Sequence, residues 1–294
     1  MTAARRAENR SASRHLTPPA AERLRKIRLL ASDIDGTLLT SDHRVLPEVR
    51  KAVAEAEAAG LTFVLASARS PTALAGIAAE LDHDGPAISF SGGWTGAIEP
   101  RRDQMSATEV FHIRKAAALA VAERALALGL VPSWHSEQAW LVPRSSPEIE
   151  REARVTHELP HVTPHLADAP EPNKILVIGP PPTLLALRDS VQKSHGLYLE
   201  TTFSHPDYLE VLPKGVDKAA ALLRLATRRG IRTEEIAAVG DGENDLGMIQ
   251  AAGLGVAMAN ALSSVRDAAD WITASNDDAG VARLIHLIIE AQRR

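Results

Sequence analysis

Two short acidic segments, far apart in the sequence, hold the side chains best suited to chemistry. They are Asp33-Ile34-Asp35-Gly36-Thr37 and Gly240-Asp241-Gly242-Glu243-Asn244-Asp245. Each follows an apolar run typical of a buried strand, Ile27–Ala31 before the first and Ile236–Val239 before the second. If both strands belong to one parallel sheet, the four aspartates meet at its carboxyl edge, where open α/β sheets bind ligands.

The chemistry expected of such a cluster is phosphoryl transfer assisted by a metal ion. Clustered carboxylates raise one another's pKa unless a cation neutralises them, and oxygen ligands favour a hard dication such as Mg²⁺. Asp33 and Asp35 are two residues apart, so they face the same side of an extended chain. One can attack phosphorus while the other handles the proton of the leaving group.

Each acidic segment also has a purely structural interpretation. The first could be an ordinary turn, and in the second Asp241 or Asn244 could simply cap a helix. However, Asp245 follows Asp241 by four residues, in the first turn of a predicted helix, which brings the two carboxylates together. Capping explains one acidic residue there and not two.

A lysine and a strand-end serine extend the candidate site. Lys218 lies at the start of a helix predicted over Asp217–Arg229, with Asp217 as N-cap. A cation is unfavourable at that positive end unless an anion lies in front of it. Ser67 ends a predicted strand just before a helix that begins at Ser70-Pro71, a place suited to phosphate, and the nearby Arg69 could orient a phosphate or a carboxylate.

Strands and helices alternate on both sides of a central insert. The first part predicts strands over Ile27–Ala31, Leu61–Ala66 and Ala87–Phe90, separated by helices, and this order indicates a doubly wound parallel sheet. Ser91-Gly92-Gly93 suggests a joint to a second domain. We therefore expect an α/β core formed by residues 24–92 and 205–294, with an α+β cap domain inserted over 93–204.

Bulk properties exclude several classes of function. A formal net charge of −4 gives no reason to expect nucleic acid, and no apolar run reaches the ~20 residues that cross a bilayer. The absence of cysteine removes disulfides and zinc thiolate sites and fits a cytoplasmic protein. Residues 1–23, rich in Arg and Ser, predict a disordered tail, with a transit peptide as the alternative.

Taken together, the motifs resemble the haloacid dehalogenase-like superfamily, and within it the Cof-type sugar and flavin phosphatases. Four signatures occur in the family's order, Asp33-x-Asp35-Gly-Thr-Leu-Leu, Ala66-Ser67-Ala68-Arg69, Gly-Val-Asp-Lys218 and Gly-Asp241-Gly-Glu-Asn244-Asp245. The resemblance implies a Rossmann-like core with an inserted cap that supplies the substrate pocket. One departure is Ala68, where the family often has glycine.

The resemblance also implies a role for each residue. Asp33 would be the nucleophile that forms an aspartyl-phosphate, Asp35 the general acid and then base, and Lys218 the cation that holds both the phosphate and the nucleophile. Mg²⁺ would be bound by Asp33, Asp241, the backbone carbonyl of Asp35 and, directly or through water, Asp245. Substrate binding would fall to Ser67, Arg69 and Asn244, whereas Trp134, His135, Glu137 and Trp140 of the insert are expected to be hairpin or packing residues.

We therefore predict a Mg²⁺-dependent phosphomonoester hydrolase that acts on a small phosphorylated metabolite such as a sugar phosphate. The main alternative is a phosphomutase, which moves the phosphoryl group without releasing inorganic phosphate. A receiver-like phosphoacceptor is a further alternative, although receivers are shorter and lack an insert. A non-catalytic binder is also considered, but every catalytic position is filled.

Overall fold

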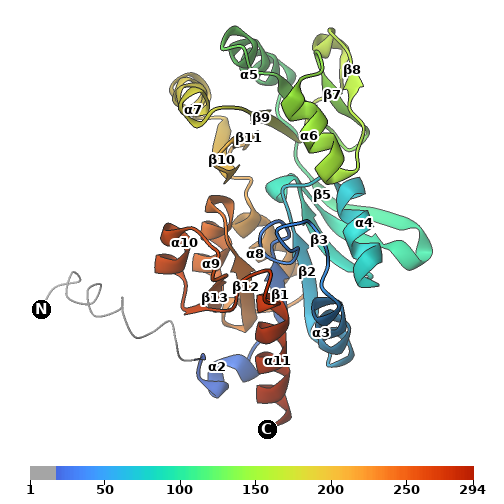
Figure 1. Cartoon of the computed structure of the whole chain (residues 1–294), viewed down its shortest axis with the longest axis vertical. Coiled ribbons are helices and arrows are strands. Elements are labelled where there is room, and N and C mark those ends of the chain that lie inside the picture. Colours follow the sequence, from blue (N-terminus) through green and yellow to red (C-terminus); the bar gives the residue numbers. More distant parts are fainter. Residues whose placement is uncertain (1–17) are drawn as a thin grey trace, which may run out of the picture.

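The computed structural model describes residues 18–294, and an eight-stranded sheet forms its lower half (Figure 1). The strand order is β14-β13-β12-β1-β2-β3-β4-β5, and neighbours from β14 to β3 are parallel. The two remaining strands, β4 and β5, add to the edge in antiparallel fashion. The strand bounds are β1 (Leu29–Ser32), β2 (Thr62–Ala66), β3 (Gly85–Ser89), β4 (Trp94–Glu99), β5 (Gln104–Val110), β12 (Ile236–Gly240), β13 (Leu254–Ala257) and β14 (Trp271–Ile272).

Helices cover both faces of this sheet because its buried strands are apolar on both sides. In β1, Leu30 packs with the helices of one face, whereas Leu29 and Ala31 pack with those of the other. The first face carries α3 (Pro47–Ala58), α4 (Pro71–Leu81), α10 (Ser263–Ala268) and α11 (Gly280–Arg293), and the second carries α8 (Lys218–Arg228) and α9 (Leu246–Ala251). The doubly wound core predicted from the sequence is confirmed.

A second sheet of six strands forms the cap above the core (Figure 1). Its order is β10-β11-β9-β6-β7-β8, and α5 and α7 pack on one of its faces. The cap elements are α5 (Lys115–Ala127), β6 (Pro132–His135), β7 (Trp140–Val142), α6 (Pro147–Thr156), β8 (His161–Val162), β9 (Lys174–Ile178), α7 (Pro181–His195), β10 (Leu199–His205) and β11 (Tyr208–Pro213). Short 3-10 helices occur at η1 (Phe90–Gly92), η2 (Pro100–Arg102), η3 (Leu166–Asp168), η4 (Thr233–Glu235) and η5 (Glu243–Asp245).

The boundaries predicted for the inserted cap domain, residues 93 and 204, do not coincide with the division of the strands between the core sheet and the cap sheet. Strands β4 and β5 lie in the core sheet, and β11 lies in the cap sheet, so the cap elements fall between β5 and the end of β11. The Ser91-Gly92 pair is a tight reversal, with φ of 51° and 106°, that returns the chain alongside β3. Glycines that looked like a joint between domains are therefore a turn inside the core.

The N-terminal tail expected over residues 1–23 falls mostly outside the described residues. Its last part is helical, because α2 (Ala21–Arg25) begins at Ala21, so the boundary at 23 is wrong. Arg23 fixes this helix to the core through an ion pair of 2.6 Å with Asp270 and a hydrogen bond of 2.7 Å to the carbonyl of Gly253. Within residues 18–294, no helix is long and apolar enough to span a bilayer.

Because the turn at Gly92 is tight, we expect replacement of this glycine by alanine to lower the stability of the protein more than the same replacement at an open position. A Cβ atom there would lie 2.4 Å from the carbonyl oxygen of Asp217, just before α8, and the positive φ already disfavours alanine. Gly92→Ala is expected to lower the free energy of unfolding by about 3 kcal/mol, measured by urea denaturation. Gly60→Ala is the control, since its φ is also positive but no atom lies within 4 Å, and about 1 kcal/mol is expected. Equal losses for the two variants would contradict the close contact.

Candidate active site

The ends of β1 and β12 lie side by side and bring the two acidic segments together. The strands pair in parallel, with Ser32 opposite Val239. The backbone N–H of Asp33 continues this pairing and donates to the carbonyl of Val239 at 3.0 Å. Asp33 and Asp241 each follow their strand directly, so the convergence indicated by the sequence is present at the carboxyl edge of the sheet.

Lys218 lies at the start of α8 and forms ion pairs with two of the aspartates. Asp217 caps the helix by accepting the N–H of Ala220 at 2.7 Å, which directs the next side chain into the site. The Lys218 Nζ atom lies 2.5 Å from Asp33 Oδ1 and 2.7 Å from Asp245 Oδ1, and the lysine is buried. A cation at the positive end of a helix is thus stabilised by two carboxylates in front of it.

Three donors fix the carboxylate of Asp245. Its Oδ1 accepts the Lys218 ammonium, and its Oδ2 accepts the backbone N–H groups of Asp241 and Gly242, each at 3.0 Å. Gly240 leaves room for this arrangement, since a Cβ atom there would lie 2.5 Å from the Asp245 side chain. Asp245 therefore orients the loop that carries Asp241.

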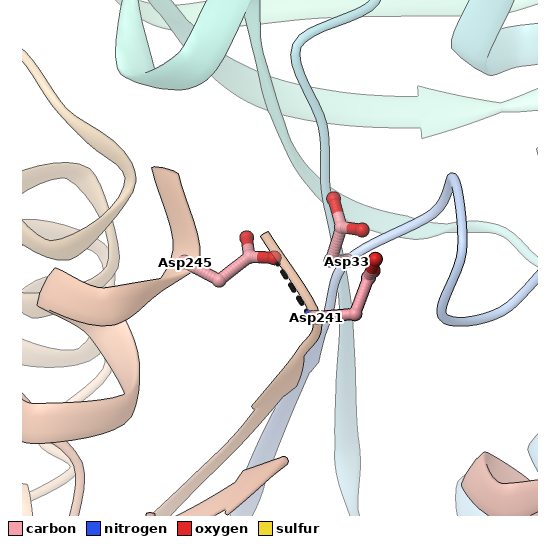
Figure 2. A group of neighbouring side chains, drawn as sticks. All are labelled: Asp33, Asp241 and Asp245. Atoms are coloured by element: carbon pink, nitrogen blue, oxygen red, sulfur yellow. Dashed lines mark hydrogen bonds between the residues drawn. The ribbon is translucent and has the colours of Figure 1, made fainter. Parts of the chain in front are cut away.

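Asp33, Asp241 and Asp245 form a group able to hold a metal ion. Each offers a carboxylate oxygen, and these oxygens lie within 4.8 Å of one another (Figure 2). Asp245 already accepts three hydrogen bonds, so Asp33 and Asp241 are the better placed direct ligands. Thr37 donates to Asp241 Oδ1 at 2.6 Å, and Gly36 lets the chain pass closely, because a Cβ atom there would meet Asp241 Oδ2 at 2.5 Å.

The electrostatics of this group call for one more positive charge. Burial and the charge of Asp245 raise the pKa of Asp33 well above its usual value, despite Lys218. Burial and the same neighbour raise the pKa of Asp241 to about 6. Burial alone would lower the pKa of Lys218, but the two carboxylates outweigh it and raise that pKa. Carboxylate oxygens whose negative charge is only partly neutralised are the kind of ligand that Mg²⁺ prefers.

Asp35 lies apart from the three carboxylates and is held by Arg69. The guanidinium donates to both Asp35 oxygens, at 2.8 and 2.7 Å, and the His43 ring lies 3.5 Å away. Burial would raise the pKa of Asp35, but the hydrogen bonds from Arg69 and His43 outweigh it and hold that pKa well below its usual range. Any contact between Asp35 and a metal would therefore involve its backbone carbonyl, as the resemblance implies.

A cavity of about 620 Å³ opens between the core and the cap at these residues. Its walls include Asp33, Asp35, Arg69 and Asn244. Ser67 is buried beside them, where its hydroxyl accepts the N–H of Arg69 at 3.0 Å, and it forms no wall of the cavity within the described chain. The structure thus places most of the predicted residues around one cavity, whereas Ser67 and Lys218 are buried and do not line it.

Several residues of the site escaped the sequence analysis. The Asn260 side chain donates to the Gly36 carbonyl at 2.7 Å, and Lys174 of the cap donates to the Ala68 carbonyl at 2.6 Å. Thr37 was part of the first acidic segment, but its hydrogen bond to Asp241 was not predicted. Lys174 begins an apolar strand, and no local pattern marks it as part of the site.

The four residues considered in the cap insert do not reach the cavity within the part of the chain that the structure describes. Trp134 is fully buried in the cap core, and the rings of His135 and Trp140 stack with centroids 5.3 Å apart. Glu137 lies 3.5 Å from His112. Their expected role in the hairpin and in packing is confirmed for the three aromatic rings.

Comparison with known proteins identifies relatives along most of the chain. A family model for haloacid dehalogenase-like hydrolases matches residues 30–285. The chain is 30% identical, over 88% of its length and 94% of the relative's, to the 5-amino-6-(5-phospho-D-ribitylamino)uracil phosphatase YcsE of Bacillus subtilis. It is 29% identical to an HMP-PP phosphatase of Serratia proteamaculans, over 81% of this chain and 86% of that protein.

Solved structures agree with the sequence relatives. A haloacid dehalogenase-like hydrolase from Bacteroides thetaiotaomicron superposes with a TM-score of 0.77 at 30% identity, covering 88% of this chain and 98% of that chain. The subclass IIB sugar phosphatase BT4131 superposes with a TM-score of 0.76 at 25% identity, covering 87% and 96%. The similarity thus includes both the core and the cap.

Removal of the Lys218 charge is expected to destabilise the protein strongly when metal is absent. Lys218→Met leaves buried carboxylates without their counter-ion, so the free energy of unfolding in EDTA should fall by about 3–5 kcal/mol. Lys214→Met is the matched control, because that lysine is exposed and pairs with Glu200 at the surface. Denaturation with and without Mg²⁺ measures both, and Mg²⁺ should recover part of the loss. Similar small losses for both variants would contradict the buried ion pair.

Stability in EDTA is expected to fall as the pH rises between about 4 and 7. A carboxyl whose pKa is raised in the folded state binds its proton more tightly there, so stability is lost as the pH rises through that pKa, which is about 6 for Asp241. Asp241→Asn should flatten this slope, and Asp267→Asn, on the surface, should not. Mg²⁺ at 100 times its Kd should add about 2.7 kcal/mol to the wild type. A slope that Asp241→Asn leaves intact would show that Asp241 does not titrate as described.

Proposed function

The chain belongs to the haloacid dehalogenase-like hydrolase family and is a phosphatase, and we propose that it hydrolyses the phosphate ester of a small metabolite with Mg²⁺ and with Asp33 as nucleophile. The observation that carries this proposal is the environment of Asp33. Its carboxylate faces a cavity at the tip of β1, pairs with Lys218 at 2.5 Å and lies beside Asp241. A nucleophile, the buried cation that holds it and a neighbouring candidate metal ligand thus lie together at the tip of β1.

Charge neutralisation comes first in the proposed reaction. A carboxylate that approaches a phosphate dianion is repelled by it, so positive charge must lie on both groups before in-line attack. Mg²⁺ bound by Asp33 and Asp241 would supply two positive charges at the phosphoryl oxygens. Lys218 supplies another and holds the Asp33 carboxylate, while Asp245 keeps the lysine and the Asp241 loop in position.

Asp33 then forms a bond to phosphorus as the ester oxygen leaves, and water hydrolyses the aspartyl-phosphate in a second step. Asp35 would move the protons of both steps. Bound to Arg69 it is ionised, which is the protonation state required of the group that takes a proton from the attacking water. A substrate phosphate beside Arg69 would compete for the guanidinium and raise the pKa of Asp35, so that Asp35 can protonate the leaving group in the first step.

The substrate class follows from the relatives and from the cavity. The named relatives act on a phosphorylated ribitylaminouracil, on HMP-PP and on sugar phosphates. The cavity of about 620 Å³ is of the size that encloses a small metabolite. We therefore propose a phosphorylated sugar, polyol or similar small molecule as substrate.

Release of inorganic phosphate from a panel of phosphate esters tests this function. We expect turnover that requires Mg²⁺ and is abolished in Asp33→Asn, because the amide cannot attack phosphorus. Asp35→Asn should lower kcat by about 10²–10⁴-fold, the usual contribution of general acid–base catalysis. Asp267→Asn, on the surface, is the control. Rearranged ester without phosphate release would indicate a mutase, and wild-type turnover by Asp33→Asn would exclude Asp33 as nucleophile.

A further inference from the structure

The cap side of the cavity is built from alternate residues of two neighbouring strands. β9 and β11 pair in antiparallel fashion, with Glu210 opposite Leu176. The residues of one face pack in the cap core, namely Ile175, Val177, Leu209 and Val211. The residues of the other face line the cavity, namely Lys174, Leu176, Tyr208 and Glu210. Together with α6, this second face forms the roof above Asp33.

Both cations of the roof already have carboxylate partners. Arg151 of α6 lies 2.7 Å from Asp207, in the turn between β10 and β11. Lys174 is buried, lies 3.5 Å from Glu210 and donates to the Ala68 carbonyl at 2.6 Å. A negative group on the non-phosphate part of a substrate would therefore find no free cation in the roof.

Glu152 of α6 is the roof carboxylate without a cationic partner. It is 9% exposed and lines the cavity, and its Oε2 accepts the hydroxyl of Tyr208 at 2.8 Å. Among residues 18–294, no lysine, arginine or histidine lies within ion-pair distance of it. Burial raises the pKa of Glu152, although Lys174 and Arg69, which lie beyond ion-pair distance, act to lower it. The same burial penalises a second negative charge brought beside this carboxylate.

A carboxylate in this setting selects for hydrogen-bond donors. Two carboxylate oxygens offer about four acceptor sites, and Tyr208 occupies one of them. A ligand hydroxyl or amino group can use those that remain. A ligand carboxylate or second phosphate would instead meet like charge at short range in a partly desolvated space.

We propose that Glu152, held by Tyr208, is the specificity-determining residue of the cap, which favours leaving groups with hydroxyl or amino donors and rejects those with a second negative charge. This inference rests on the phosphatase function proposed above. It narrows the substrate class to phosphate monoesters of polyols, sugars or amino-bearing alcohols, and it excludes phosphorylated carboxylic acids and bisphosphates as good substrates.

The test compares two esters that differ in one group. Glycerol 3-phosphate and 3-phosphoglycerate share the phosphate and the central hydroxyl, but one ends in a hydroxymethyl group and the other in a carboxylate. We expect the Mg²⁺-loaded wild type to favour the first by at least about tenfold in kcat/KM. Glucose 6-phosphate and glucosamine 6-phosphate then distinguish hydroxyl from amino recognition, and p-nitrophenyl phosphate reports whether the chain hydrolyses phosphate esters at all.

Variants test whether Glu152 causes the preference for glycerol 3-phosphate over 3-phosphoglycerate. Glu152→Gln keeps the size and an acceptor for Tyr208 but loses the charge, so the preference for glycerol 3-phosphate should fall by about tenfold. Tyr208→Phe, a milder change, should lower it about threefold by freeing the carboxylate to move. Glu150→Gln is the control, because Glu150 is an exposed residue on the same helix and does not line the cavity. The Glu150→Gln variant should show the same preference between the two esters as the wild type.

The outcomes separate this inference from the proposed function. Hydrolysis of p-nitrophenyl phosphate without preference between the glycerol esters would overturn the specificity role and leave the phosphatase intact. An unchanged preference in both Glu152→Gln and Tyr208→Phe would do the same. Absence of hydrolysis of every ester by the folded wild type would overturn both.

Discussion

Two buried carboxylates and a half-buried third lie close to a single ammonium group, and this imposes the constraint on which the rest of the site depends. Lys218 can neutralise one of Asp33 and Asp245, and Asp241 adds a further negative charge beside them. Burial makes this excess costly, as the raised pKa values of Asp33 and Asp241 show. The fold maintains an arrangement of carboxylates that is unfavourable alone and would become favourable on binding a cation, as a reversible metal site requires.

The core and the cap divide recognition between them. The core gathers carboxylates that need cations, so under the proposed function it would bind the phosphate together with Mg²⁺. The cap presents a roof whose cations are already paired and whose Glu152 carboxylate accepts hydrogen bonds. Arg69 connects the two halves, since it holds Asp35 and also donates to the Val155 carbonyl of α6 at 3.2 Å. The position of α6 and the orientation of Asp35 are thereby linked through one side chain.

Local sequence patterns correctly predicted which side chains lie at the carboxyl ends of the strands, because the position of these residues depends on their near neighbours in the sequence. An apolar run followed by aspartate places the carboxylate at a sheet edge, and the spacing of Asp241 and Asp245 returns the second carboxylate to the first. The limits of the insert were predicted wrongly, since Gly92 serves equally well in a turn and in a domain joint. The role of Lys174 depends on the pairing of β9 with a distant strand, and that of Glu152 depends on the contact between α6 and Tyr208 of β11. No local pattern carries that information.

A crystal structure with Mg²⁺ and beryllium fluoride tests the central claim most directly, because this salt imitates a phosphoryl group on aspartate. The account predicts a fluoroberyllate bonded to an Asp33 carboxylate oxygen, with Lys218 beside it and one Mg²⁺ between Asp33 and Asp241. A fluoroberyllate bonded to another residue, or a cation bound away from the Asp33, Asp241 and Asp245 group, would contradict it.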